Sequence, residues 1–215
     1  MKEAPTPARR KTGRPLSFDP EAALAPALLL FWRHGYEATS LADLTRAMGV
    51  TPPSVYAAYG DKKGLFRAVV RRYLEQPISP VAAIAQASTA EAAARGLIEG
   101  AVVAFTGRNT PAGCLLASSA IAVSPGSEDL KRELAAIRRD IETALRKKIE
   151  AEIPTGARRG KIDAGALAAF TMTVVQGLST LARDGASRSK LRKVASLAMA
   201  NWPSGMSQEK NSRSW

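Results

Sequence analysis

The sequence is poor in the residues from which most active sites and metal centres are built. It has one cysteine, Cys114, and one histidine, His34, among 215 residues. A single cysteine excludes an intramolecular disulfide and a cysteine-rich zinc site, and a single histidine leaves the common hydrolase and metalloenzyme mechanisms poorly supplied. The sequence also lacks a glycine-rich phosphate loop, a cluster of metal ligands and a catalytic triad. We therefore expect no enzyme, no metal site and no cofactor, and a carboxylate-based enzyme remains the enzymatic alternative.

The sequence offers little that suggests a membrane or an export signal. The apolar run from Gly96 to Gly107 is far shorter than the roughly 20 residues that span a bilayer, and it contains Glu99. Residues 1–19 are basic, but they contain neither an apolar segment nor a cleavage signal. These observations predict a cytoplasmic protein without a membrane partner.

Acidic residues are scarce relative to basic ones. Lys and Arg total 31 against 19 Asp and Glu, which gives a net charge of +12 and a pI of about 10.3. Such an excess indicates a polyanionic partner, either nucleic acid or anionic lipid. Residues 1–75 carry 12 basic and 7 acidic side chains, and residues 1–15 alone carry 5 and 1. The positive charge of this region therefore lies mainly in the first 15 residues, whose basic side chains, Arg14 among them, could follow a minor groove or phosphates.

What the sequence does contain is helical patterning. No stretch alternates with the period of a strand, and alanine is abundant, so we expect an all-α protein. A first helix should begin near residue 20 and end at Gly35, with a kink or a late start caused by Pro26. The other helices are expected at residues 40–48, 51–59, 61–75, 88–105, 113–123, 130–149, 163–183 and 187–202.

Three of these expectations concern particular side chains. Ser88-Thr89-Ala90-Glu91 has the spacing of a capping box and should open the helix that ends at Phe105. The last helix should place Leu197 and Trp202 inward. The long helix at 130–149 has a charged face that includes Arg138, and we interpret this face as solvated.

The segment from Thr39 to Tyr59 has the spacing of a helix-turn-helix. Leu44 and Val55 face inward on two short helices, which are joined by a turn at Gly49. The first turn of the second helix would reach base edges in a major groove, so its exposed residues should be small or able to form hydrogen bonds. The residues that meet this description are Thr51, Pro52, Pro53, Ser54 and Tyr56.

On these residues the chain resembles the tetracycline-repressor (TetR) family of transcription regulators. About 60 residues match in order, and a looser match covers Gly113–Leu116, Gln176–Leu178 and Arg183–Ala186. The closely matching segments are Gly13-Arg14-Pro15, Phe31-Trp32, Gly35–Leu41, Met48-Gly49-Val50 and Ser54–Phe66.

The resemblance implies an all-helical homodimer with a helix-turn-helix headpiece and a C-terminal domain that binds a small effector. It implies phosphate contacts from Thr39 and Ser40, and backbone contacts from Tyr56 and Lys62. It also places Pro52, Pro53 and Ser54 against bases. Tyr59 stands where the family more often has phenylalanine, and its hydroxyl suits phosphate contact or packing.

The helices of residues 88–151 and 163–183 should enclose the effector. We expect an apolar, partly aromatic ligand, because the helices offer apolar inward faces and a few polar groups. Arg95 and Arg108 could instead select an anion, and Cys114 could act as a redox or electrophile sensor, because a helix start lowers the pKa of a thiol. The predicted pocket residues are Phe105, Cys114, Ser118, Ile141, Phe170 and Gln176.

The sequence thus predicts four segments and one main function. The segments are a basic arm (1–15), a helix-turn-helix domain with a connecting helix (16–75), a ligand-binding and dimerisation domain (76–203) and a tail (204–215). The predicted function is ligand-responsive repression at a palindromic double-stranded DNA operator, from which a small molecule releases the homodimer. An architectural DNA binder without an effector is a further alternative, although it would not need the long apolar helices of residues 88–200.

Overall fold

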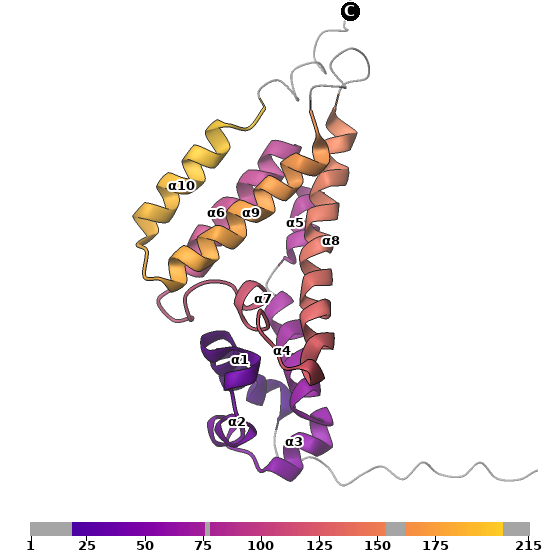
Figure 1. The fold of residues 1–215 in the computed structure, drawn as a ribbon, viewed down its shortest axis with the longest axis vertical. Coiled ribbons are helices and arrows are strands. Elements are labelled where there is room, and N and C mark those ends of the chain that lie inside the picture. Colours follow the sequence, from indigo (N-terminus) through magenta and orange to yellow (C-terminus); the bar gives the residue numbers. More distant parts are fainter. Residues whose placement is uncertain (1–18, 76–77, 154–161, 204–215) are drawn as a thin grey trace, which may run out of the picture.

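The computed structural model of the protein describes residues 19–75, 78–153 and 162–203, and these residues form helices joined by turns, without a strand. Figure 1 shows the helices of residues 20–74 at one end of the molecule and those of residues 90–105 and 164–200 at the other, with α8 (Glu128–Glu152) running alongside both groups. The all-α prediction is confirmed. The basic arm and the tail predicted at the two ends of the chain lie outside the described residues.

The first four helices form the end that contains the helix-turn-helix. They are α1 (Pro20–Ala38), α2 (Leu41–Met48), α3 (Pro52–Tyr59) and α4 (Lys62–Leu74), and α1 packs against both α2 and α4. We call these four helices the headpiece.

Helix α1 begins where its capping signal predicts. The Asp19 carboxylate accepts hydrogen bonds from the backbone N–H groups of Glu21 and Ala22. The expected late start is wrong, because α1 begins at Pro20 and Pro26 lies inside it, whereas a kink at Pro26 stays a prediction. The non-helical backbone within α1 is at Gly35, with φ of 81°. Here the chain turns so that the N–H of Tyr36 donates to the carbonyl oxygen of Ser119, 2.7 Å away. The bend at Gly35 therefore docks the end of α1 on the C-terminal part of the chain.

The C-terminal part contains α5 (Pro80–Gln86), α6 (Ala90–Phe105), α7 (Leu115–Ser118), a short 3₁₀ turn (Pro125–Ser127), α8 (Glu128–Glu152), α9 (Ala164–Arg183) and α10 (Arg188–Ala200). Helix α5 was not predicted, although Ser79 caps it and a proline follows at its first position. Helix α7 is much shorter than the predicted helix at 113–123, because the chain breaks into turns after Ser118.

The start of α6 corrects the predicted capping box. The N-cap is Thr89, whose hydroxyl accepts the N–H of Ala92 at 3.0 Å, and Glu91 pairs with Arg95 one turn further on. The N–H of Ala90 instead donates to both carboxylate oxygens of Glu152, each at 2.8 Å. A carboxylate from the end of α8 thus accepts the first free N–H of α6, a contact that the predicted capping box did not include.

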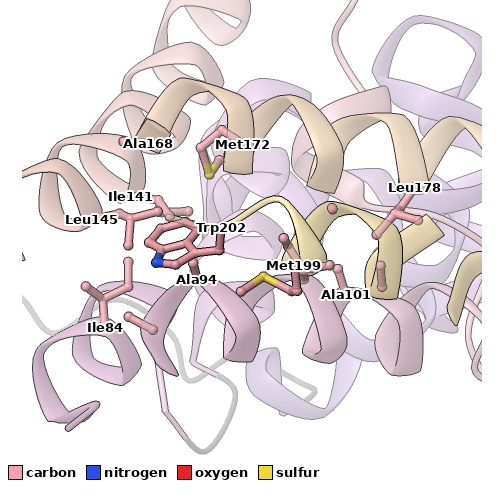
Figure 2. Packing of buried hydrophobic residues seen from close by; sticks show 14 of the residues in the cluster. Ile84, Ala94, Ala101, Ile141, Leu145, Ala168, Met172, Leu178, Met199 and Trp202 are labelled. Carbon is pink, nitrogen blue, oxygen red and sulfur yellow. The ribbon is translucent and has the colours of Figure 1, made fainter. Parts of the chain in front are cut away.

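Two hydrophobic cores meet along α8. Leu130 and Leu134 belong to the core of the headpiece and α7, whereas Ile141 and Leu145 belong to the core of α5, α6, α9 and α10. Figure 2 shows the second core, with the buried ring of Trp202 among Ile84, Ala94 and Leu145. The inward position predicted for Trp202 is confirmed, but that predicted for Leu197 is wrong, because this side chain is 67% exposed.

Helix α9 has the length and composition of a membrane span, with 20 residues and a mean hydropathy of 1.4 over an 18-residue window. Residues 164–182 are uncharged, and this run is longer than the run at residues 96–107 from which we expected no membrane span. In the structure α9 packs against α6, α8 and α10, as a core helix of a folded domain does. A single helix of this kind is weak support for a membrane span.

Candidate DNA-binding surface and effector cavity

The turn between α2 and α3 holds the two helices in the helix-turn-helix geometry. Gly49 adopts the left-handed conformation, with φ of 66°, and its N–H donates to the carbonyl oxygen of Arg46. Leu44 and Val55 are fully buried, so each short helix is fixed by its apolar face. The opposite face of α3 is left exposed at one end of the molecule (Figure 1).

The exposed start of α3 carries the residues predicted to read bases. Thr51, Pro52 and Pro53 are exposed, Ser54 is half-buried, and the Tyr56 side chain is 51% exposed. The hydroxyls of Thr51 and Ser54 lie 2.9 Å apart and share a hydrogen bond. Because the prolines lack an N–H, these three hydroxyls are the main polar groups that this surface offers to a base edge.

Two other predicted DNA contacts lie at the start of α2. Ser40 is exposed and caps the helix by accepting the N–H of Asp43 at 3.0 Å. The Thr39 side chain is only 2% exposed, and its hydroxyl donates to the carbonyl oxygen of Gly35 at 2.6 Å. A phosphate contact from Ser40 remains a prediction, whereas the hydroxyl of Thr39 is buried and engaged within the chain.

Tyr59 and Lys62 are engaged within the headpiece. The Tyr59 hydroxyl donates to the carbonyl oxygen of Pro20 at 2.7 Å, and burial raises the pKa of this hydroxyl, so packing is the better of its two predicted roles. The Lys62 ammonium lies 4.3 Å from the centre of the Tyr36 ring, and burial lowers its pKa. A phosphate contact from Lys62 remains a prediction, and Arg14 lies outside the described residues.

A cavity of about 560 Å³ lies between the headpiece and the C-terminal helices. Its wall combines Trp32 of α1 and Tyr73 of α4 with residues of α5, α6, α8 and α9. A volume of this size is in the range of small-molecule sites, which are usually apolar with a few polar groups. Of the predicted pocket residues, the four that line this cavity are Phe105, Cys114, Ile141 and Gln176.

The other two predicted pocket residues lie elsewhere. Phe170 is 43% exposed and does not line the cavity, so its predicted inward position is wrong. Met172 does line the cavity, and Phe170 precedes it by two residues, a little more than half a helical turn. The two side chains therefore lie on nearly opposite faces of α9. Ser118 is not in the cavity wall; its hydroxyl donates to the carbonyl oxygen of Cys114 and accepts from Arg183.

Sequence reasoning missed Arg138, which lines the cavity instead of facing solvent. Its guanidinium donates to the carbonyl oxygen of Leu116, and burial lowers its pKa. The signal was in the spacing, since Leu134, Arg138, Ile141 and Leu145 step by 4, 3 and 4 and share one helix face. Arg95, proposed as an anion contact, pairs instead with Glu91 and Glu99.

Cys114 is tied into the cavity wall by two hydrogen bonds. Its Sγ lies 3.5 Å from the Tyr73 hydroxyl, and its N–H donates to the Ser179 hydroxyl at 2.8 Å. Burial is the main cause that raises the pKa of the Tyr73 hydroxyl, and the neighbouring Cys114 raises it further. Within the described ranges, no three His, Cys, Asp or Glu side chains gather as metal ligands.

Direct hydrogen bonds join the headpiece to the C-terminal part of the chain. The indole N–H of Trp32 donates to the carbonyl oxygen of Gly113 at 3.0 Å, and Arg183 donates to the carbonyl oxygens of Trp32 and Arg33. On α8, Asp129 accepts from Lys63 and Arg67 of α4, each at 2.8 Å. The headpiece is therefore bonded through α1 to the turn before α7 and to α9, and through α4 to α8.

Comparison with known proteins gives matches along most of the chain. The model of bacterial regulatory proteins of the tetR family matches residues 23–69, and the model of the tetracyclin repressor-like C-terminal domain matches residues 90–198. The HTH-type transcriptional repressor ComR of Escherichia coli (strain K12) is 36% identical over 197 residues, which cover 91% of this chain and 94% of ComR. The repressor BdcR of the same organism is 32% identical over 191 residues, which cover 88% of this chain and 91% of BdcR.

A solved structure gives a matching picture of the fold. A cysteine mutant of the TetR family transcriptional regulator CifR, complexed with 26 bp double-strand operator DNA, superposes with a TM-score of 0.81. It is 37% identical, and the match covers 88% of this chain and all of the CifR chain. The helix-turn-helix, the C-terminal helices and the relatives agree: this chain belongs to the tetracycline-repressor (TetR) family of DNA-binding transcription regulators.

Proposed function

We propose that the protein is a ligand-responsive repressor, which binds a palindromic operator as a homodimer and is released when a small molecule fills the cavity. The observation that carries this proposal is the position of Trp32 and Tyr73, two headpiece residues in the wall of the cavity. A ligand in the cavity would touch the DNA-binding part of the chain directly. The repressors ComR and BdcR, and the operator complex of CifR, support the DNA-binding half of the proposal.

On the DNA side, α3 would enter the major groove and present the hydroxyls of Thr51, Ser54 and Tyr56 to base edges. Pro52 and Pro53 would make apolar contacts, for which thymine methyl groups are suitable partners. Ser40 and Lys62 would contact phosphates, and residues 1–15 would add charge in an adjacent groove. In this assignment residues 16–75 are the DNA-binding unit, and residues 76–203 bind the ligand and the second copy.

For the dimer, we propose an interface on the outer faces of α9 and α10. Phe170 and Leu197 are 43% and 67% exposed, so each of these helices leaves a large apolar side chain uncovered. A second copy packed there would bury both side chains. The two α3 helices would then reach successive major-groove faces, about 34 to 36 Å apart.

Release would follow from a difference in affinity. A ligand shifts the equilibrium only if it binds more tightly to the conformation in which the headpieces no longer match the two half-sites. A coupling of about 1 to 3 kcal/mol, typical of such systems, would weaken operator binding by about 5- to 150-fold.

The proposal is tested with an operator selected from a pool of random duplexes. Compounds that raise the melting temperature of the protein are then added to the operator complex, and binding is followed by fluorescence anisotropy. A ligand at 100 times its Kd adds about 2.7 kcal/mol of stability, which is readily seen as a shift in melting temperature. We expect stabilising compounds to release the operator, whereas compounds that stabilise the protein and never release DNA would refute ligand-responsive repression.

A further inference from the structure

Among the described residues, one charged side chain lines the cavity. Its described lining residues include Arg138 but no Asp, Glu, Lys or His, so no second ionised group faces the guanidinium across the cavity. Most of the remaining wall is formed by alanine, glycine and larger apolar side chains, among them Ile84 and Leu97 on the side of α5 and α6. The described wall of the cavity is therefore apolar apart from a few polar groups and one cationic side chain.

Arg138 is held in position without being neutralised. Its guanidinium donates a hydrogen bond to the Leu116 carbonyl oxygen, and burial is the main reason that its pKa is lowered. A guanidinium has five N–H donors. Among the described residues it has no carboxylate partner. A partly desolvated cation with spare donors is stabilised by an anion that enters the cavity.

The polar groups that line the cavity together with Arg138 include no carboxylate among the described residues. Cys114 also lines the cavity, and the Tyr73 hydroxyl donates to the Cys114 sulfur. Because burial raises the pKa of Tyr73, this hydroxyl stays protonated and adds no negative charge to the wall. The ring of Trp32 packs edge-on against that of Tyr73, 5.0 Å away, so aromatic surface borders this polar corner.

We infer that the cavity binds an amphipathic organic anion, with its acidic group on Arg138 and its apolar body against α5 and α6. The inference rests on the proposed function of the cavity and names the class of ligand. An acid should therefore bind about ten- to hundred-fold more tightly than the alcohol of the same shape, because hydrogen bonds to a charged group are stronger than neutral ones. Guanidinium and carboxylate also match in geometry, which favours a two-point contact.

The test compares two pairs of probes by isothermal titration of the full chain. The acids are decanoate and 2-naphthoate, and the neutral partners are 1-decanol and 2-naphthylmethanol. The variants are Arg138→Gln and Arg138→Lys, with Arg139→Gln as the matched control, because Arg139 is the next residue on α8 and is exposed. Circular dichroism checks that each variant is folded, and operator binding is measured with each probe.

We expect the acids to bind at least about tenfold more tightly than the alcohols to the wild type and to Arg139→Gln. Arg138→Gln should remove this preference, and Arg138→Lys should keep part of it, because lysine retains the charge but not the planar fork. Equal binding of acid and alcohol, an unchanged preference in Arg138→Gln, or no binding of either acid at millimolar concentration would overturn the inference.

Operator binding separates this inference from the proposed function. If decanoate binds through Arg138 but leaves operator affinity unchanged, the ligand class is supported and ligand-responsive repression is refuted. If 1-decanol releases the operator as well as decanoate does, repression by ligand is supported and the anionic class is refuted.

Discussion

The hydrogen bond between Trp32 and Gly113 should make a measurable contribution to stability, which Trp32→Phe removes. Trp32 is 6% exposed, and its N–H donates to the Gly113 carbonyl oxygen at 3.0 Å. The change removes roughly 40 Å³ of side chain, which at about 24 cal/mol per Å³ costs about 1 kcal/mol. An acceptor left without its buried donor costs about 1 to 3 kcal/mol more, and the lower half of that range applies because an under-satisfied carbonyl oxygen is better tolerated than an orphaned N–H.

The expected loss in the free energy of unfolding is therefore about 2 to 3 kcal/mol, or about 4 to 12 °C in melting temperature for a chain of this length. It is measured by urea unfolding followed by circular dichroism, in which the midpoint should fall while the slope with denaturant stays constant.

Trp202→Phe is the matched control. This indole, which Figure 2 shows in the hydrophobic core, is also 6% exposed, but its N–H has no hydrogen-bond partner among the described residues. The same volume is lost without a hydrogen bond, so the cost should stay at about 1 kcal/mol or below. If Trp32→Phe destabilises the protein no more than Trp202→Phe does, the hydrogen bond is not the link between headpiece and cavity wall that we describe.

Three further predictions follow from single contacts. Gly113→Ala should destabilise the protein by about 3 kcal/mol or more in the same urea assay, because φ is 81° and the new Cβ would lie 2.9 Å from a carbonyl oxygen of α9; a loss below 1 kcal/mol would contradict the close approach. Tyr59→Phe should cost about 1 kcal/mol of stability through the lost bond to Pro20 and leave operator selectivity intact, whereas a changed binding-site preference in a selection from random duplexes would show that this hydroxyl reads DNA. The Lys63 ammonium lowers the pKa of Asp129, so this carboxylate stabilises the protein above its unfolded pKa of about 3.9, and the stabilisation is lost as the pH falls through the lower folded pKa. Asp129→Asn should therefore reduce the fall in the free energy of unfolding at acidic pH. An unchanged fall would show that other groups cause the loss of stability in acid.

The sequence predicted the features that depend on neighbouring residues. Asp19, Asp163 and Ser187 cap α1, α9 and α10 as their positions before the helices indicate. The turn of the helix-turn-helix was also predictable, because Gly49 is the residue type that ends a helix in the left-handed conformation. Each of these signals acts within one helical turn of its own chain segment.

The features that the sequence did not predict depend on contacts between distant segments. Glu152 caps α6 from 62 positions away, which no local pattern encodes. Arg138 was assigned to the solvated face by its charge, although its spacing placed it on the apolar stripe of α8. Phe170 was assigned inward by its spacing from Leu167 and Val174, although the buried face of α9 is formed by Ala164, Ala168, Met172 and Leu178. For Arg138 residue type and helical phase disagreed and the phase determined the position, whereas on α9 small side chains form much of the buried face, which the spacing of large apolar residues does not reveal.

The most direct test of ligand-responsive repression is reciprocity between the two sites. Of decanoate and 1-decanol, the compound that binds more tightly is titrated by calorimetry into the free protein and into the protein saturated with its selected operator. If the ligand weakens operator binding by a given factor, the operator must weaken ligand binding by the same factor, expected at about 5- to 150-fold. Equal ligand affinity with and without operator would contradict the claim that a ligand in the cavity, through Trp32 and Tyr73, changes the affinity of the headpiece for DNA.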